Sequence, residues 1–150
     1  QMRTREEGLM EYLGQSCYKG TVHHIELDPA DPAGSRSLLE AFLHSRRGVA
    51  GAMVLNSRIY ELVGLLAQTD DRQKQKIVAA GFEAIGPNVE ALRHGDVAFL
   101  ISQRPELQGY DAVKALGNWF LYGHAPAKVN YMPIDILLRE NVEYYNNYKL

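Results

Sequence analysis

The stretch PNVEALRHGDVAFLI, residues 87–101, contains one complete structural unit of this chain. Pro87 suits the first turn of a helix, Val89 and Leu92 recur at helical spacing, and Gly95 suits the position just after a helix ends. The residues that follow, 97–101, are apolar on both faces, as in a strand buried within a sheet. A helix that leads directly into a buried strand is typical of an α/β fold.

Similar units precede and follow this stretch. Apolar spacing predicts helices over residues 3–13, from a cap at Ser35 to Gly48, from a cap at Ser57 through Leu66, and from Pro105 to Gly123. Strands are predicted at residues 21–27, 50–55 and 76–82, a loop at 28–34, and two extended pieces within 129–137, separated by Pro133. This order implies an α/β fold with a three-layer, doubly wound and mostly parallel sheet, covered by helices on both faces.

Length, composition and charge restrict the class of protein. The chain has 150 residues, 46% of them hydrophobic, which suits one domain with a real core. Sixteen basic residues against 18 acidic ones give a net charge of −2, so no basic surface is available for nucleic acid. Apolar runs are far shorter than the ~20 residues that cross a bilayer, and no charged leader with a hydrophobic stretch opens the chain, so we expect a soluble domain.

Polar residues follow the predicted strands at the point where each one ends. Asn56-Ser57-Arg58 follows one strand, Glu83 the next and Ser102-Gln103-Arg104 the third, while Arg5 lies in the first turn of a helix. In such sheets a ligand binds beyond the carboxyl ends of the strands, so we expect these residues to share one edge. A carboxylate, a guanidinium and amides together provide the donors and acceptors that sugar hydroxyls need.

Each of these residues also has a plainer interpretation. Asn56 or Gln103 can satisfy the backbone of its own loop, Arg5 can pair with a neighbouring Glu, and Glu83 can be a solvated turn residue. We interpret Arg58 and Arg104 as surface charges and leave them out of the site.

Other chemistry finds little support in the sequence. His23 and His24 point to opposite faces of the predicted strand and make a poor metal pair, and Cys17 has no activating neighbour. The Gly48–Gly51 segment precedes a strand and therefore cannot form a phosphate-binding turn. We expect no catalytic residues, no metal and no cofactor, and therefore no enzyme.

The motifs resemble those of the type I periplasmic-binding-protein-like family, which includes ribose-binding proteins and lac-repressor-type regulators. Arg5-Glu6-Glu7-Gly8-Leu9 is similar to the family's Arg-x-x-Gly-Phe helix start, and Val54-Leu55-Asn56-Ser57 to its strand ending in Asn-Asp. Gly81-Phe82-Glu83 resembles the family's Gly-Phe-Asp, and residues 91–110 its helix-ending Gly, strand, Gln-x-Pro and later Gly. The tail at residues 131–136 resembles the last return strand.

The resemblance implies a fold with two lobes that clamp a ligand, usually a sugar, around a hinge of three chain crossings. The residues that fall on the family's sugar contacts are Arg5, Asn56, Glu83 and Gln103. Glu83 replaces the usual Asp, Ser57 replaces the Asp that follows the Asn, and the first lobe is missing. Residues 1–150 therefore resemble one ligand-binding lobe, and residues from about 106 to 125 resemble the segment that returns to the first lobe.

Three functions are considered at this point, and for the third, an enzyme on a similar doubly wound sheet, the sequence offers no nucleophile with a base, no metal cluster and no phosphate loop. One is the effector-binding lobe of a lac-repressor-type transcription regulator in the cytoplasm, whose DNA contacts lie in another domain. By resemblance to those regulators, this lobe would form a homodimer through Glu61, Gly64, Leu65 and residues 87–91. The alternative is a periplasmic sugar-binding protein of a transporter or sensor system. The N-terminal part of the full protein distinguishes the two.

Overall fold

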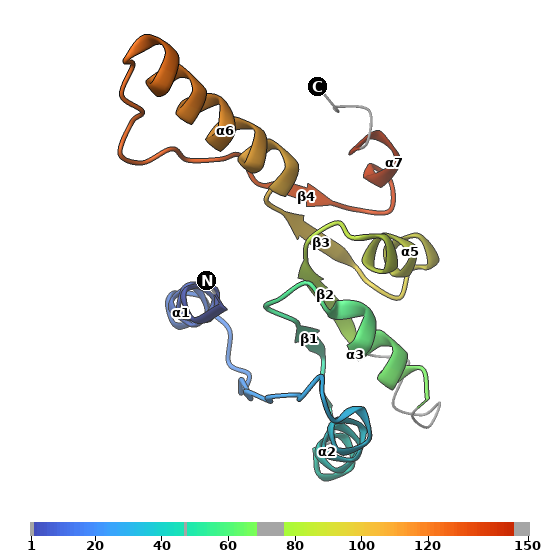
Figure 1. Cartoon of the computed structure of the whole chain (residues 1–150). Coiled ribbons are helices and arrows are strands. Elements are labelled where there is room, and N and C mark those ends of the chain that lie inside the picture. The colour runs from blue at the N-terminus through green and yellow to red at the C-terminus, as the bar shows by residue number, and fades with distance from the viewer. Residues whose placement is uncertain (1, 47, 69–76, 146–150) are drawn as a thin grey trace.

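Helices and strands alternate along the chain and the strands form one sheet (Figure 1). The computed structural model describes residues 2–46, 48–68 and 77–145. The elements are α1 (Met2–Gln15), α2 (Pro32–Ser45), β1 (Gly51–Met53), α3 (Ile59–Leu66), β2 (Val78–Phe82), α5 (Gly86–His94), β3 (Phe99–Ser102), α6 (Pro105–Tyr122), β4 (Asp135–Leu137) and α7 (Val142–Tyr145). The predicted α/β class is confirmed.

The sheet has the order β1-β2-β3-β4 and is mostly parallel. β1 pairs with β2 and β2 with β3 in parallel, whereas β4 is antiparallel to β3. The carboxyl ends of β1, β2 and β3 therefore lie along one edge. β4 begins at this same edge, where Asp135 lies opposite Ser102.

The core lies between the sheet and the helices that cover it. α3 and α5 lie side by side on one side of the sheet, and α1 lies on the other (Figure 1). Ile59, Leu92 and Leu100 are completely buried. A Cβ at Gly81 would lie 2.7 Å from the Cβ of Ile59, so only glycine lets α3 approach β2 this closely.

Three of the helix ends that glycine or proline marks agree with the sequence, whereas α2 ends at Ser45, before the predicted Gly48. Gly95 and Gly123 cap α5 and α6 in the left-handed conformation, and Pro105 begins α6, as predicted. The two predicted serine caps are wrong. Asp31 caps α2, its carboxylate accepting a hydrogen bond from the Gly34 backbone, and α3 begins at Ile59 without a side-chain cap. At α2, Asp31 lies four residues upstream of Ser35, and its negative charge favours a helix N-terminus.

The prediction of a strand at residues 21–27 is also wrong, because this segment has no regular secondary structure. Its alternating pattern suits a strand, but a strand is stabilised by pairing, and no described segment pairs with it. Val22 is 41% exposed as a result. Of the two extended pieces predicted within residues 129–137, the second contains β4, at residues 135–137, and residues 129–134 form no strand. Lys76, the first residue of the strand predicted at 76–82, lies outside the described residues.

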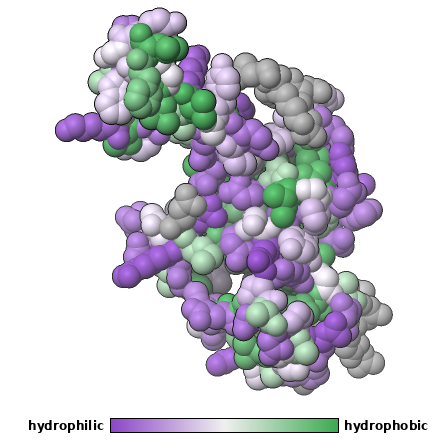
Figure 2. Space-filling view, in the orientation of Figure 1, coloured by the Kyte–Doolittle hydropathy of each residue, from purple (hydrophilic) through white to green (hydrophobic). Residues whose placement is uncertain are grey.

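α6 differs from the other long helices because it projects away from the sheet (Figure 1). None of its residues is buried, and Val113, Phe120 and Leu121 are each at least 70% exposed. The space-filling view shows hydrophobic side chains gathered over this helix (Figure 2).

Candidate binding site at the sheet edge

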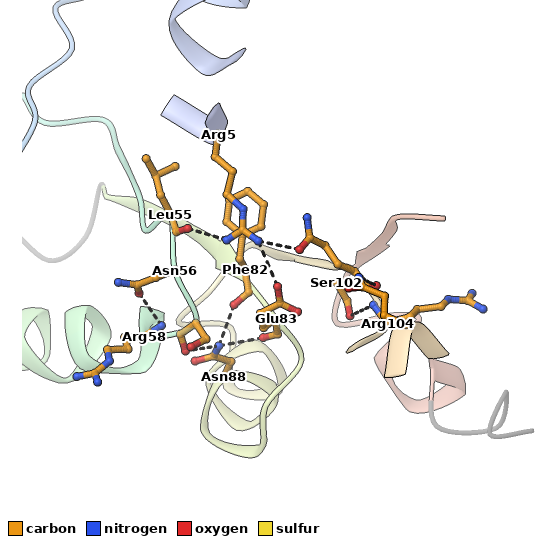
Figure 3. A network of polar contacts seen from close by, with 12 residues as sticks. Arg5, Leu55, Asn56, Arg58, Phe82, Glu83, Asn88, Ser102 and Arg104 are labelled. Atoms are coloured by element: carbon orange, nitrogen blue, oxygen red, sulfur yellow. Dashed lines mark hydrogen bonds and ion pairs between the residues drawn. The ribbon is translucent and has the colours of Figure 1, made fainter. Parts of the chain in front are cut away.

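Arg5 is the centre of a polar cluster at the carboxyl edge of the sheet (Figure 3). It reaches from α1 toward the strand ends, and its guanidinium carbon lies 3.9 Å from the centre of the Phe82 ring. Nη1 donates a hydrogen bond to the Leu55 carbonyl oxygen (2.7 Å), and Nη2 donates to Gln103 Oε1 (2.9 Å). Stacking on an aromatic ring and forked donation are the two properties that distinguish arginine from lysine. Arg5 thus connects the ends of β1, β2 and β3.

Glu83 supplies the carboxylate of this cluster. Its Oε1 lies 3.3 Å from Arg5 Nη2, and the side chains of Arg5 and Glu83 are only 13% and 19% exposed. Glu83 has a positive φ of 68°, which is unusual for a residue with a side chain, and its backbone N–H donates to the Ile101 carbonyl. This backbone turn directs the carboxylate out of the sheet toward Arg5 (Figure 3).

The cluster is incompletely satisfied. Arg5 Nε and Glu83 Oε2 are both buried, and neither has a hydrogen-bond partner. Burial of an unpaired polar atom costs free energy, so such atoms are rare in folded proteins and require an explanation. One atom is a donor and the other an acceptor, the combination that a hydroxyl group can satisfy.

Asn56, the fourth predicted residue, lies at the same edge but outside the Arg5 cluster. Its Oδ1 accepts a hydrogen bond from the Arg58 backbone N–H (2.9 Å), which closes the loop before α3. This contact matches the plainer interpretation of Asn56. The structure therefore brings Arg5, Glu83 and Gln103 into contact and leaves Asn56 beside them.

One residue at this edge was misjudged from the sequence. Arg104, interpreted as a surface charge, is only 31% exposed and forms a two-pronged ion pair with Asp135, with contacts of 2.5 and 2.9 Å. These hydrogen bonds hold the pKa of the Asp135 carboxyl below its usual range. Arg58, also interpreted as a surface charge, is 45% exposed and pairs with Glu61.

Asn88 was missed entirely from the sequence. Its side chain is fully buried and forms hydrogen bonds to the loop after β1, at Ser57, and to the loop after β2, at Glu83. The sequence contains one signal for it. Asn88 lies at helical spacing from Ala91 and Leu92, on the apolar face of its helix, where a polar residue requires partners.

The remaining candidates contribute nothing to this cluster. Cys17 is exposed, and His24 lies 2.9 Å from Glu6, a residue of α1. Within the described residues, no three metal-binding side chains lie close enough to hold an ion.

Comparison with known families agrees with this architecture. A model of the periplasmic binding protein domain matches residues 1–119. The chain belongs to this family. No curated protein matches the chain. Among the described helices of this family member, none is long and apolar enough to cross a membrane.

Solved structures of similar fold include both regulators and carriers. A candidate LacI transcriptional regulator from Bacteroides fragilis is 32% identical with a TM-score of 0.84, covering 96% of this chain and 48% of that one. An ABC transporter solute-binding protein from Agrobacterium vitis, bound to α-D-tagatopyranose, is 23% identical with a TM-score of 0.78 over 94% and 46%. One from Burkholderia graminis, in complex with D-arabinose, is 20% identical with a TM-score of 0.77 over 91% and 48%. The chain thus spans about half the length of these proteins.

Proposed function

We propose that this chain binds a sugar or similar small polar ligand at the Arg5 cluster, as part of the effector-binding region of a LacI-type transcription regulator. The proposal rests on two buried atoms that have no hydrogen-bond partner, Arg5 Nε and Glu83 Oε2. A ligand hydroxyl would donate to Oε2 and a ligand oxygen would accept from Nε, which removes the cost of burying both atoms.

The charge of the cluster supports an uncharged ligand. Arg5 and Glu83 neutralise each other, and the nearby Arg104 is paired with Asp135. A phosphorylated sugar or a sugar acid would bring a negative charge to a wall that has no net positive charge to meet it. Gln103 and Asn56 add side-chain amides, whose N–H groups suit further hydroxyls.

Closure of a cleft between two lobes is the proposed response to the ligand. The apolar, exposed surface of α6 supports this proposal, because a helix that exposes several large apolar side chains needs a partner surface. Residues from about 106 to 125 would return to the other lobe. Ligand contact with both lobes would then favour the closed state by the difference in affinity between open and closed forms.

The regulator is favoured over the carrier by the similarity to the Bacteroides fragilis structure, which exceeds that to the two solute-binding proteins. A cytoplasmic homodimer would form through Glu61, Gly64, Leu65 and residues 87–91, with DNA bound by a domain outside this chain. Gly64 has no atom within 4 Å of the position its Cβ would take, so a partner helix could approach closely. The second candidate is a periplasmic sugar carrier, favoured by the sugar-bound solute-binding proteins of the same fold.

A ligand screen of the full-length protein tests the binding proposal. D-arabinose, D-tagatose, D-allose and myo-inositol, which are ligands of solved structures of this fold, would be compared with sugar phosphates and purines by thermal shift. A ligand at 100 times its dissociation constant stabilises the protein by about 2.7 kcal/mol. We expect stabilisation by an uncharged sugar, and stabilisation by an anionic ligand alone would contradict the proposal.

The choice between regulator and carrier needs separate measurements. Sedimentation of the full-length protein and its binding to genomic DNA fragments with and without sugar would decide it. A sugar-sensitive DNA-binding dimer supports the regulator, whereas a monomer without DNA binding supports the carrier.

A further inference from the structure

Asn88 in the first turn of α5 connects two of the loops that form the proposed ligand site (Figure 3). Its side chain is fully buried. The Nδ2 amide lies within hydrogen-bond distance of the backbone carbonyls of Ser57 (3.0 Å), Phe82 (3.1 Å) and Glu83 (2.9 Å), and two of these carbonyls share one of its two N–H groups. Its Oδ1 accepts a hydrogen bond from the Tyr60 backbone N–H (3.3 Å). One side chain thus holds the loop after β1, the loop after β2 and the start of α3.

The loop after β2 needs this support because of its unusual backbone. Glu83 has a φ of 68°, which a residue with a Cβ adopts only where the surroundings compensate for the strain. Its carbonyl and that of Phe82 both point away from the sheet and toward Asn88 (Figure 3). Loss of the Asn88 amide would remove a hydrogen-bond donor from both carbonyls, and a buried carbonyl that lacks a donor destabilises the loop.

We propose that Asn88 is a positioning residue for the ligand site, acting through Glu83 and Ser57 without touching the ligand. The proposal rests on the proposed binding function of the Arg5 cluster. By fixing the Glu83 backbone, Asn88 sets the direction in which the carboxylate leaves the chain toward Arg5. By holding the Ser57 carbonyl, it also fixes the loop that carries Leu55 and Asn56.

The chemistry of the position explains why asparagine is needed. Three carbonyls need a donor here and one backbone N–H needs an acceptor, and a primary amide carries two N–H donors and one acceptor oxygen on the same carbon. Aspartate has the same shape but no donor when ionised, so it would place a negative charge against three carbonyl oxygens. Glutamine keeps both functions but displaces them by one methylene in a tightly packed turn.

The test compares Asn88→Asp with a matched control in the full-length protein. The control is Asn141→Asp, because Asn141 also bridges a backbone N–H and a carbonyl, those of Leu138 and Ile136, but does so in the turn after β4. Two quantities are measured. One is the affinity for whichever of D-arabinose, D-tagatose, D-allose and myo-inositol binds the unmodified protein most tightly. The other is the ¹H–¹⁵N NMR signal of the Arg5 Nε–H group in the absence of ligand.

We expect Asn88→Asp to weaken sugar binding about tenfold or more and to shift the Arg5 Nε–H signal. Asn141→Asp should change neither quantity, although both variants lower the melting temperature. Should Asn88→Asp fail to fold, Asn88→Gln, which retains the donors, replaces it with the same two expectations. Unchanged affinity together with an unchanged Arg5 signal would overturn the proposal, and so would equal effects of the Asn88 and Asn141 variants.

The two proposals can fail separately. If none of the four sugars binds the unmodified protein, the proposed function fails for these ligands. The Arg5 signal then still decides whether Asn88 positions the cluster, because it is recorded without ligand.

Discussion

Two arginine–carboxylate pairs lie along the same edge of the sheet, and they are satisfied to different degrees. In the Arg104–Asp135 pair, two guanidinium nitrogens contact both carboxylate oxygens at 2.5 and 2.9 Å. In the Arg5–Glu83 pair, one contact of 3.3 Å joins the groups, and a buried donor and a buried acceptor are left over. The first pair is therefore suited to hold the protein's own structure. The second leaves hydrogen-bonding capacity for another molecule.

The location of each pair agrees with this division. Arg104–Asp135 joins the end of β3 to the start of β4, where α6 leaves the sheet. Arg5–Glu83 joins α1 to the loop after β2 and is surrounded by strand ends rather than by another strand. Variants at the two pairs should therefore affect stability and ligand affinity to different extents.

Arg5→Met in the full-length protein should have the largest effect. The substitution keeps much of the contact with Phe82 but removes three hydrogen bonds and leaves the Glu83 carboxylate without its counter-charge. We expect the free energy of unfolding to fall by about 2–3 kcal/mol and sugar affinity to fall at least about a hundredfold. Denaturant unfolding and calorimetry measure the two quantities. Arg104→Met is the control and should lower stability with far less effect on affinity, and equal losses of affinity would contradict the division.

Glu83→Gln should separate binding from stability at the Arg5 pair itself. The amide keeps the shape of the side chain and one acceptor, but it loses the negative charge that strengthens hydrogen bonds from hydroxyls. A hydrogen bond to a charged group contributes about 1.5–3 kcal/mol, so we expect affinity to fall about tenfold to a hundredfold. Calorimetric titration with the sugar measures this loss. Undiminished affinity would remove Glu83 from the ligand site.

Asp135→Asn should act on stability and its pH dependence. Its carboxyl is partly exposed, so we expect a loss of only about 1 kcal/mol in the free energy of unfolding at neutral pH. Because Arg104 lowers the pKa of Asp135 in the folded state, the stabilisation is complete above the ordinary aspartate pKa of about 3.9. It is lost as the pH falls through the lower folded value. Unfolding measured across this range should show the difference between wild type and variant shrinking in acid, and a constant difference would exclude the ion pair as its cause.

The local patterns of the sequence predicted most of the fold. Helix ends marked by Gly95, Pro105 and Gly123 were correct because these residues act through their own backbone preferences. The strand at residues 21–27 failed because its stability depends on a neighbouring strand, which no local pattern specifies.

The candidate site was predictable to a similar extent. The strand-end rule placed Glu83 and Gln103 together, since topology alone brings the ends of parallel strands to one edge, whereas Arg5 reaches the same edge from α1. The positive φ of Glu83 and the contacts of Asn88 were not predictable, because both depend on how two loops pack over the start of α5. Arg104 was misjudged for the same reason, since its partner lies 31 residues away on β4.

Asn56→Ala should have the smallest effect, and it decides whether Asn56 belongs to the ligand site or only to its loop. A residue that served the ligand alone would leave the ligand-free melting temperature nearly unchanged when substituted. The structure instead shows Oδ1 accepting from the Arg58 backbone N–H, and loss of that contact should lower the free energy of unfolding by about 0.5–1 kcal/mol. The Nδ2 group can still donate to a ligand, so the two roles are compatible. A fall in affinity of about threefold to tenfold, measured by calorimetry beside the stability loss, would place Asn56 in both roles. Loss of stability with unchanged affinity would confine it to the loop and reduce the predicted ligand contacts on this wall to Arg5, Glu83 and Gln103.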